Sequence, residues 1–213
     1  MFDIEYKGAN AVIITTKKTK ALIDPKTSVV GLKDVISSED DVIIATETRF
    51  VPDKQVAKLV IDGPGEYEIG DMAVKGIAAK RHIDSESDRD LSTIYQVVIG
   101  DINIVVIGNI APTLSDDQLE SIGVVDMAVL PVGGGGYTLD STSATAIIRQ
   151  LEPRMVIPVH FADSALKYEV PQQDIEVFIN ELGASVIEAG PKLKVKNLGA
   201  LPEQLTIVKI SRS

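Results

Sequence analysis

The chain has 213 residues, and this length predicts one domain that spans residues 1–213 and buries a sizeable core. Its net charge of −10, with no cluster of Lys and Arg, argues against a nucleic-acid partner. The chain contains no cysteine, which excludes disulfides, thiolate metal ligands and cysteine nucleophiles.

The sequence also argues against a membrane partner. No apolar run approaches the roughly 20 residues that a helix needs to span a bilayer. The first residues, MFDIEYKG, lack the apolar stretch of a signal peptide. We therefore expect a cytoplasmic location.

The first half of the chain reads as a series of short strands. Alternating or continuous apolar residues predict strands at 2–6, 11–16, 21–24, 41–46 and 58–62.

Two turn pairs then predict two β-hairpins. Gly70-Asp71 would join strands at 66–70 and 72–79, and Gly100-Asp101 would join strands at 92–100 and 102–108.

Helices alternate with strands in the second half. Ser115 begins a capping-box pattern for a helix that ends near Gly123. Asp140 can cap a second helix, which Pro153 stops. A third helix is predicted from Pro171, where the segment QQDIEVFINEL begins, to Gly183.

Two further segments, 124–132 and 154–161, are continuously apolar and predict strands that are covered on both faces. Short strands return after residue 183. Taken together, the elements favour a layered α/β sandwich.

The two histidines, His82 and His160, are candidates for chemistry. His160 follows a buried strand, where it could act as a ligand or acid/base, or simply be a hydrogen-bonded residue at a strand end. His82 and Asp84 point the same way on an extended chain, as a ligand pair or as part of a solvated loop. One zinc on His82, Asp84 and His160 would just meet the need of a catalytic site for about three protein ligands.

Two other groups of residues have alternative readings. Gly133, Gly134, Gly135 and Gly136 follow a buried strand, where backbone N–H groups can bind an anion. They lack the Lys-Ser/Thr of a P-loop, and they could equally form a loop that passes close to another segment. Glu66 and Glu68 share one strand face, either as an acid/base pair or as exposed hairpin residues.

Several segments taken together resemble the metallo-β-lactamase fold family. They include IDGPGEYEIG, VVDMAVLPVGGGGYTLD, LEPRMVIPVHF and an early Asp24-Pro25 turn. The likeness is greatest to the small Zn-dependent hydrolase-like branch, which is related to the L-ascorbate-6-phosphate lactonases. The resemblance covers about residues 1–185 and implies a four-layered αββα sandwich with a two-metal site on one edge.

The metal-ligand motifs that this resemblance implies are mostly absent. The family carries HxHxDH after the strand at 41–46, and the segment here reads ATETRFVP, with Thr46, Thr48 and Arg49. An early Gly-His-Ser turn of the branch reads Gly8-Ala9-Asn10.

The later motifs depart as well. Arg81 stands where the third motif supplies a histidine, with His82 one residue away, and Asn109 replaces the bridging aspartate. Only the last ligand is kept, as His160. The resemblance therefore implies a vestigial site, made of Thr46, Thr48, Arg49, Arg81, His82, Asn109 and His160.

Three functions follow as hypotheses. The first is an inactive binding or scaffolding module without a cofactor, which holds a small anionic ligand through Arg49, Arg81 and the glycines at 133–136. The second is a metal-dependent hydrolase of a lactone or ester that uses a single zinc. The third is an interaction protein, for example in a homo-oligomer.

Overall fold

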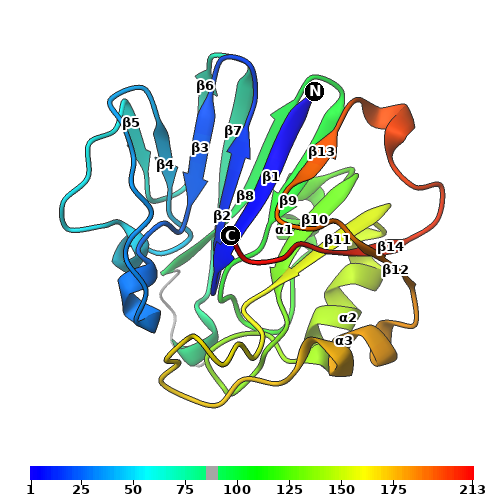
Figure 1. Ribbon diagram of the computed structural model, residues 1–213. Coiled ribbons are helices and arrows are strands. Elements are labelled where there is room, and N and C mark those ends of the chain that lie inside the picture. The colour runs from blue at the N-terminus through cyan, green and yellow to red at the C-terminus, as the bar shows by residue number, and fades with distance from the viewer. Residues whose placement is uncertain (85–90) are drawn as a thin grey trace.

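The computed structural model describes residues 1–84 and 91–213, which form two β-sheets with helices beside them (Figure 1). The six-stranded sheet has the order β13-β1-β2-β3-β4-β5. Its strands are β1 (Phe2–Gly8), β2 (Ala11–Thr15), β3 (Lys20–Ile23), β4 (Val42–Ile44), β5 (Leu59–Ile61) and β13 (Leu193–Val195).

The second sheet has eight strands in the order β12-β14-β11-β10-β9-β8-β7-β6. These are β6 (Gly65–Ile69), β7 (Met72–Ala79), β8 (Ser92–Ile99), β9 (Ile102–Val106), β10 (Met127–Pro131), β11 (Met155–Val159), β12 (Ser185–Glu188) and β14 (Thr206–Lys209). Both predicted hairpins are confirmed, because β6 pairs with β7 and β8 pairs with β9, each antiparallel to its partner.

The main core lies between the two sheets. Ile14 and Ile44 of the six-stranded sheet share one buried cluster with Val97, Ile104 and Ile157 of the eight-stranded sheet. Successive side chains of a strand point to opposite faces of the sheet, so every second side chain enters this core and the others point away from it. The continuous apolar runs of β10 and β11 are buried on both faces, because helices cover the face that points away from this core.

A second core lies between the eight-stranded sheet and the helices α1 (Asp116–Ile122), α2 (Ser141–Leu151) and α3 (Ile175–Leu182). Ile147 of α2 and Phe178 of α3 are buried there against Val156 of β11. Figure 1 shows α2 and α3 at the lower right, below β11 and β14. The predicted α/β sandwich of the metallo-β-lactamase type is confirmed in these layers.

Helical segments elsewhere in the described residues are short 3-10 helices. They are η1 (Thr27–Val30), η2 (Thr48–Phe50), η3 (His82–Asp84) and η4 (Leu198–Ala200). No helix among the described residues is long and apolar enough to cross a membrane.

The helix ends follow local capping chemistry. Ser115 and Gln118 form the predicted capping box of α1, and the Asp140 side chain caps α2 by accepting from the Ser143 N–H. The predicted start of α3 at Pro171 is wrong. The helix begins at Ile175, because the Asp174 side chain accepts from the Glu176 N–H and so ends the extended segment there.

Strand direction brings several loops to one edge of the sandwich. In the first sheet, β1, β3 and β4 run in the same direction. In the second sheet, β7, β9 and β11 do so. Residues that follow these six strands therefore meet where the two sheets end.

Candidate polar site at the strand ends

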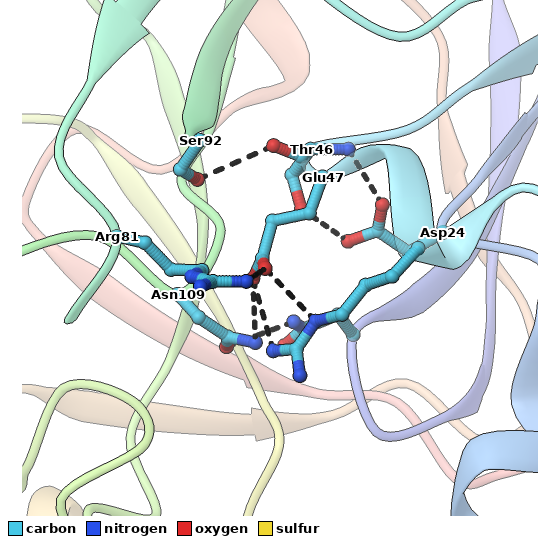
Figure 2. A network of polar contacts seen from close by, with 8 residues as sticks. Asp24, Thr46, Glu47, Arg81, Ser92 and Asn109 are labelled. Carbon is cyan, nitrogen blue, oxygen red and sulfur yellow. Dashed lines mark hydrogen bonds and ion pairs between the residues drawn. The ribbon is translucent and has the colours of Figure 1, made fainter. Parts of the chain in front are cut away.

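Thr46, two residues after the end of β4, joins the two sheets at this edge. Its N–H and hydroxyl donate to the Asp24 carboxyl group, each at 2.7 Å. Its carbonyl oxygen accepts from the Thr93 N–H at 2.8 Å and from the Ser92 hydroxyl at 3.3 Å. Figure 2 shows Thr46 between Asp24, which follows β3, and Ser92 of β8. The close approach depends on Gly108, where an added Cβ would lie 2.6 Å from the Thr46 Cβ.

Glu47 is the centre of a buried ion cluster. Its side chain is 2% exposed, and its carboxylate lies 2.8 Å from Arg49 Nε and 3.4 Å from Arg81 Nη1. Arg49 Nη2 donates to the second carboxylate oxygen at 3.1 Å, so that the Arg49 contact is bidentate. Figure 2 shows Glu47 reaching from the end of β4 toward Arg81 and Asn109, which come from the other sheet.

A chain of amide hydrogen bonds continues from Glu47. Asn109 Nδ2 donates to Glu47 Oε1 at 3.4 Å, and Asn10 Nδ2 donates to Asn109 Oδ1 at 2.9 Å. His160 Nδ1 lies 3.0 Å from Asn10 Oδ1. Asn10, Asn109 and His160 are all buried.

The chemistry of Glu47 determines which group donates and which accepts in each of these hydrogen bonds. A carboxylate that faces two guanidinium groups can only accept, so Asn109 must turn its NH₂ group toward Glu47 and its oxygen toward Asn10. Asn10 must then present its own NH₂ group to Asn109 and its oxygen to His160. Nδ1 of His160 consequently carries the proton, and Nε2 keeps its lone pair.

His160 is held as a neutral imidazole. Burial, with the nearby positive charge of Arg49 as a smaller cause, lowers the pKa of His160 to about 4. Its ring stacks on Tyr168 with centroids 5.0 Å apart. No hydrogen bond within the described residues reaches Nε2, so this atom remains an available acceptor.

A cavity of about 250 Å³ opens beside this imidazole. Its polar wall includes Arg49, Asn109 and His160, and its apolar and aromatic wall includes Phe50 and Tyr168. The cavity therefore combines an arginine, an imidazole acceptor and apolar surface, as small-molecule sites commonly do.

Three non-glycine residues at this edge have left-handed backbone conformations. Their φ angles are 48° at Ala9, 47° at Asp24 and 50° at His160. Such conformations persist only where the surroundings hold them, and here the His160 N–H donates to the Ala9 carbonyl at 2.8 Å. Strained residues of this kind concentrate at functional sites.

The residues of the predicted site do not all meet. Thr46, Arg49, Arg81, Asn109 and His160 belong to the contacts described above. The site was also predicted to contain Thr48 and His82. Thr48 is exposed on η2, and within the described residues its side chain has no hydrogen bond to the ion cluster.

His82 turns toward the glycine loop. Its Nδ1 lies 3.1 Å from the Gly136 carbonyl oxygen, whereas Nδ1 of His160 bonds Asn10. The two histidines thus have different partners. The side chain of Asp84, the third member of the alternative zinc site, lies outside the described part of the chain.

The glycines at 133–136 pass close to a neighbouring segment, as one of their two readings predicted. A Cβ at Gly133 would collide with the His160 carbonyl oxygen and the Gln172 side chain, and one at Gly135 would lie 2.8 Å from Val170. The Gly134 N–H donates to the Leu139 carbonyl, so it is not free for an anion.

Glu66 and Glu68 are exposed on β6, in agreement with the hairpin reading.

Three site residues were not predicted, namely Asn10, Asp24 and Glu47. Asn10 and Asp24 lie in turns after β1 and β3. Both turns belong to the family resemblance, which implies no role for either side chain. The signal for Glu47 was its position two residues before Arg49 at the end of a buried strand, where a carboxylate and a guanidinium group are close enough in sequence to pair.

The residues present do not fit a two-metal centre. The buried carboxylate of Glu47 is already neutralised by two guanidinium groups, whose charge opposes a metal cation at short range. Within the described residues, no group of three His, Cys, Asp or Glu side chains is arranged to hold a metal ion.

Comparisons with known proteins identify relatives of this fold. The sequence profile of the family described as "Beta-lactamase superfamily domain" matches residues 3–160. No curated protein sequence matches the chain.

Among solved structures, a protein of Thermotoga maritima is provisionally described as a Zn-dependent hydrolase of the metallo-β-lactamase superfamily. It is 17% identical with a TM-score of 0.74, and the match covers 99% of this chain and 100% of that one. Igni18, described as a metallo hydrolase of Ignicoccus hospitalis, is also 17% identical with a TM-score of 0.63, over 92% of this chain and 99% of that one. At these identities the structural likeness concerns the fold.

Proposed function

The chain belongs to the beta-lactamase superfamily domain family, and from this premise we propose that it is a degenerate member that binds a small ligand without a two-metal site. In this proposal it is catalytically inactive and serves as a binding module. The observation that carries the proposal is the ion cluster at the end of β4, where Glu47 is held by Arg49 and Arg81.

The charges of this cluster support a site without metal ions. Two guanidinium groups surround one carboxylate, so the cluster already holds more positive than negative charge. A divalent cation at Glu47 would have to displace a bidentate arginine and then lie beside both guanidinium groups. The amide of Asn109 adds no charge to attract a cation, because it is neutral.

The cavity beside the cluster supports a binding role. It has the volume for a compact organic molecule and is lined by Arg49 and His160 on one side and by aromatic rings on the other. The site would then keep the position of a superfamily active site while it performs recognition alone.

Finer assignments stay predictions. They are the membership of the lactonase-like branch, a scaffolding role, a homo-oligomeric state, the anion binding by the glycines at 133–136 and the cytoplasmic location.

A metal-dependent hydrolase of a lactone or ester is the competing function. Two observations favour it, namely the descriptions of the related structures as metal-dependent hydrolases and the free Nε2 of His160. It would need a single metal on His160, His82 and Asp84 or another carboxylate.

Metal content separates the two functions. We expect elemental mass spectrometry of tag-free protein to find far less than one zinc per chain, and zinc titration to leave the melting temperature unchanged. We also expect no hydrolysis of lactones or esters when zinc is added. About one zinc per chain would overturn the proposal if it is lost in His160→Ala and kept in the exposed control Glu66→Gln.

A further inference from the structure

We infer that the cavity beside His160 binds a small 2-hydroxy acid, a monocarboxylate with a hydroxyl group on the neighbouring carbon and a compact apolar body. This inference rests on the proposed function, because it treats Arg49 and His160 as ligand-binding groups of a metal-free site. It goes further by naming the class of ligand.

Arg49 supplies the carboxylate-binding group. Nε and Nη2 contact Glu47, which leaves N–H groups of the same guanidinium without a role in the ion pair. The side chain is 39% exposed and lines the cavity. Because Arg81 shares the charge of Glu47, Arg49 keeps positive charge for a second carboxylate.

His160 supplies the hydroxyl-binding group. The hydrogen-bond chain from Glu47 through Asn109 and Asn10 leaves the lone pair of His160 Nε2 without a partner among the described residues. A lone pair requires a donor from the ligand, and an alcohol hydroxyl provides one. A carboxylate oxygen has no hydrogen to offer, so the ligand needs a hydroxyl group in addition to its carboxylate.

The carboxylate of Glu169 lies on the cavity wall and affects how much negative charge the ligand can carry. Its carboxylate hydrogen-bonds with Tyr137 and raises the pKa of that hydroxyl. A negative charge on the wall repels a dianion more strongly than a monoanion. The charges of the cavity thus favour a ligand with one carboxylate.

The apolar wall limits the body of the ligand. Val29, Val30 and Val170 line the cavity together with Phe50 and the ring of Tyr168. The Tyr168 hydroxyl is occupied, because it donates to the Phe161 carbonyl at 2.9 Å. A volume of about 250 Å³ lies below the size of pockets for drug-sized ligands, so the ligand has a short branched or aromatic body.

The test compares two acids that differ by one hydroxyl group. Mandelate and phenylacetate share the aromatic body and the carboxylate, and inorganic phosphate serves as the third probe. Isothermal titration calorimetry of the full chain, in the presence of a chelator, should show 1:1 binding of mandelate. We expect phenylacetate to bind about tenfold more weakly, the usual effect of one hydrogen bond, and phosphate not to bind.

Each other outcome has a definite meaning. Equal affinity for the two acids, tighter binding of phosphate, or no binding of any probe would overturn the hydroxy-acid inference and leave the metal-free proposal standing. Mandelate binding that disappears with the chelator and returns with zinc would overturn the proposed function itself.

The ring nitrogens of His160 provide a second measurement that needs no variant. The chain has only two histidines, so long-range ¹H–¹⁵N spectra can assign both. We expect Nδ1 of His160 to be protonated and Nε2 to be bare at pH 7. A proton on Nε2 would contradict the inference.

A variant tests the same atom. His160→Phe keeps a ring to stack on Tyr168 and removes both nitrogens. In this variant we expect mandelate and phenylacetate to bind equally well, and a retained preference for mandelate would overturn the role of His160. If the variant does not fold, the nitrogen spectra of the unaltered protein decide the question.

Discussion

At the scale of single residues, Glu47 shows how a buried charge can be kept inside a protein. Burial of an isolated carboxylate is costly, and the cost is offset only by close opposite charges and satisfied hydrogen bonds. Glu47 has both, through Arg49, Arg81 and the Asn109 amide. Because the side chains of Arg49 and Arg81 are 39% and 25% exposed, solvent screens part of their attraction.

Glu47→Gln tests this residue. The substitution keeps the size of the side chain but removes the charge that both arginines share. We expect the free energy of unfolding to fall by about 2 kcal/mol, less than for a fully buried ion pair because the arginines are partly exposed.

Chemical denaturation measures this change, and Glu68→Gln on exposed β6 is the matched control, with an expected change within about 0.5 kcal/mol. Equal effects of the two substitutions would show that the ion cluster does not stabilise the fold.

The residues of the site differ in how far the sequence revealed them. The resemblance marked Arg49, Arg81 and Asn109 as departures from a metal-binding pattern, and the structure brings all three to Glu47. It did not reveal the role of Asn10, because an asparagine in a turn has no periodic signal. The role of Asn10 depends on its contacts with Asn109 and His160, which are 99 and 150 residues away in the chain.

At the scale of elements, the site depends on how closely the end of β4 approaches the segment after β9. Thr46 and Gly108 meet there, and a Cβ on Gly108 would lie 2.6 Å from Cβ and Oγ1 of Thr46. A contact this short cannot be accommodated by a rotamer change, because Cβ is fixed by the backbone. The two segments must therefore move apart if residue 108 has a side chain.

Gly108→Ala should destabilise the protein by about 2 kcal/mol, as overpacking of a core does. The separation of the segments should also weaken the contact between Asn109 and Glu47. Gly63→Ala is the control, since nothing lies within 4 Å of its added Cβ and its φ is not in the left-handed region. There we expect no loss, or a gain of up to about 1 kcal/mol.

Thermal and chemical unfolding of the two variants provide the measurement. A Gly108→Ala protein as stable as Gly63→Ala would mean that the ends of the two sheets are not tightly packed.

Local signals predicted most elements, since they act over a few residues. The turn pairs Gly70-Asp71 and Gly100-Asp101 marked both hairpins, and Asp140 marked the start of α2. The start of α3 was misplaced because Pro171 and Asp174 are both helix-start signals, and the side-chain cap of Asp174 prevailed.

At the scale of the whole molecule, the order of strands was beyond local signals. Apolar periodicity predicted layers, but β1 pairs with β13 from the other end of the chain, and no local pattern specifies that partner. The arrangement of two sheets with a site at one edge came from the resemblance. The family profile and the two packed sheets confirm the arrangement of the sheets, and the functional role of their edge stays a prediction.

Two buried groups on this edge make the stability of the whole molecule depend on pH in opposite ways. Burial raises the pKa of Asp24 to about 7, with a smaller contribution from the charge of Glu47. An aspartate in the unfolded chain has a pKa near 3.8. Between these values the folded chain holds a proton that the unfolded chain has released. Stability from Asp24 is therefore full below pH 4 and is lost as the pH rises to about 7.

His160 has the reverse effect. Its pKa is about 4 in the folded chain and 6.5 in the unfolded chain. Between these values the unfolded chain holds the extra proton, so stability from His160 is full above pH 6.5 and is lost as the pH falls to about 4. From about pH 4 to 6.5 the two effects on stability cancel. In this range the folded chain holds a proton on Asp24, and the unfolded chain holds one on His160 instead.

Asp24→Asn should reveal the pH dependence of stability that the two opposing groups conceal. Asparagine can accept from the Thr46 N–H and donate to the Thr46 hydroxyl, so it keeps both contacts of Asp24 without a titrating group. In this variant the free energy of unfolding should rise between pH 4 and 6.5 by about 1 kcal/mol per pH unit relative to the unaltered protein. His160→Phe should show a fall of similar size with rising pH. Urea denaturation at several pH values measures the free energy of unfolding of all three proteins. The titrations of the remaining carboxylates are common to the three proteins and cancel in the differences. Parallel curves would therefore refute the pH dependence assigned to Asp24 and His160.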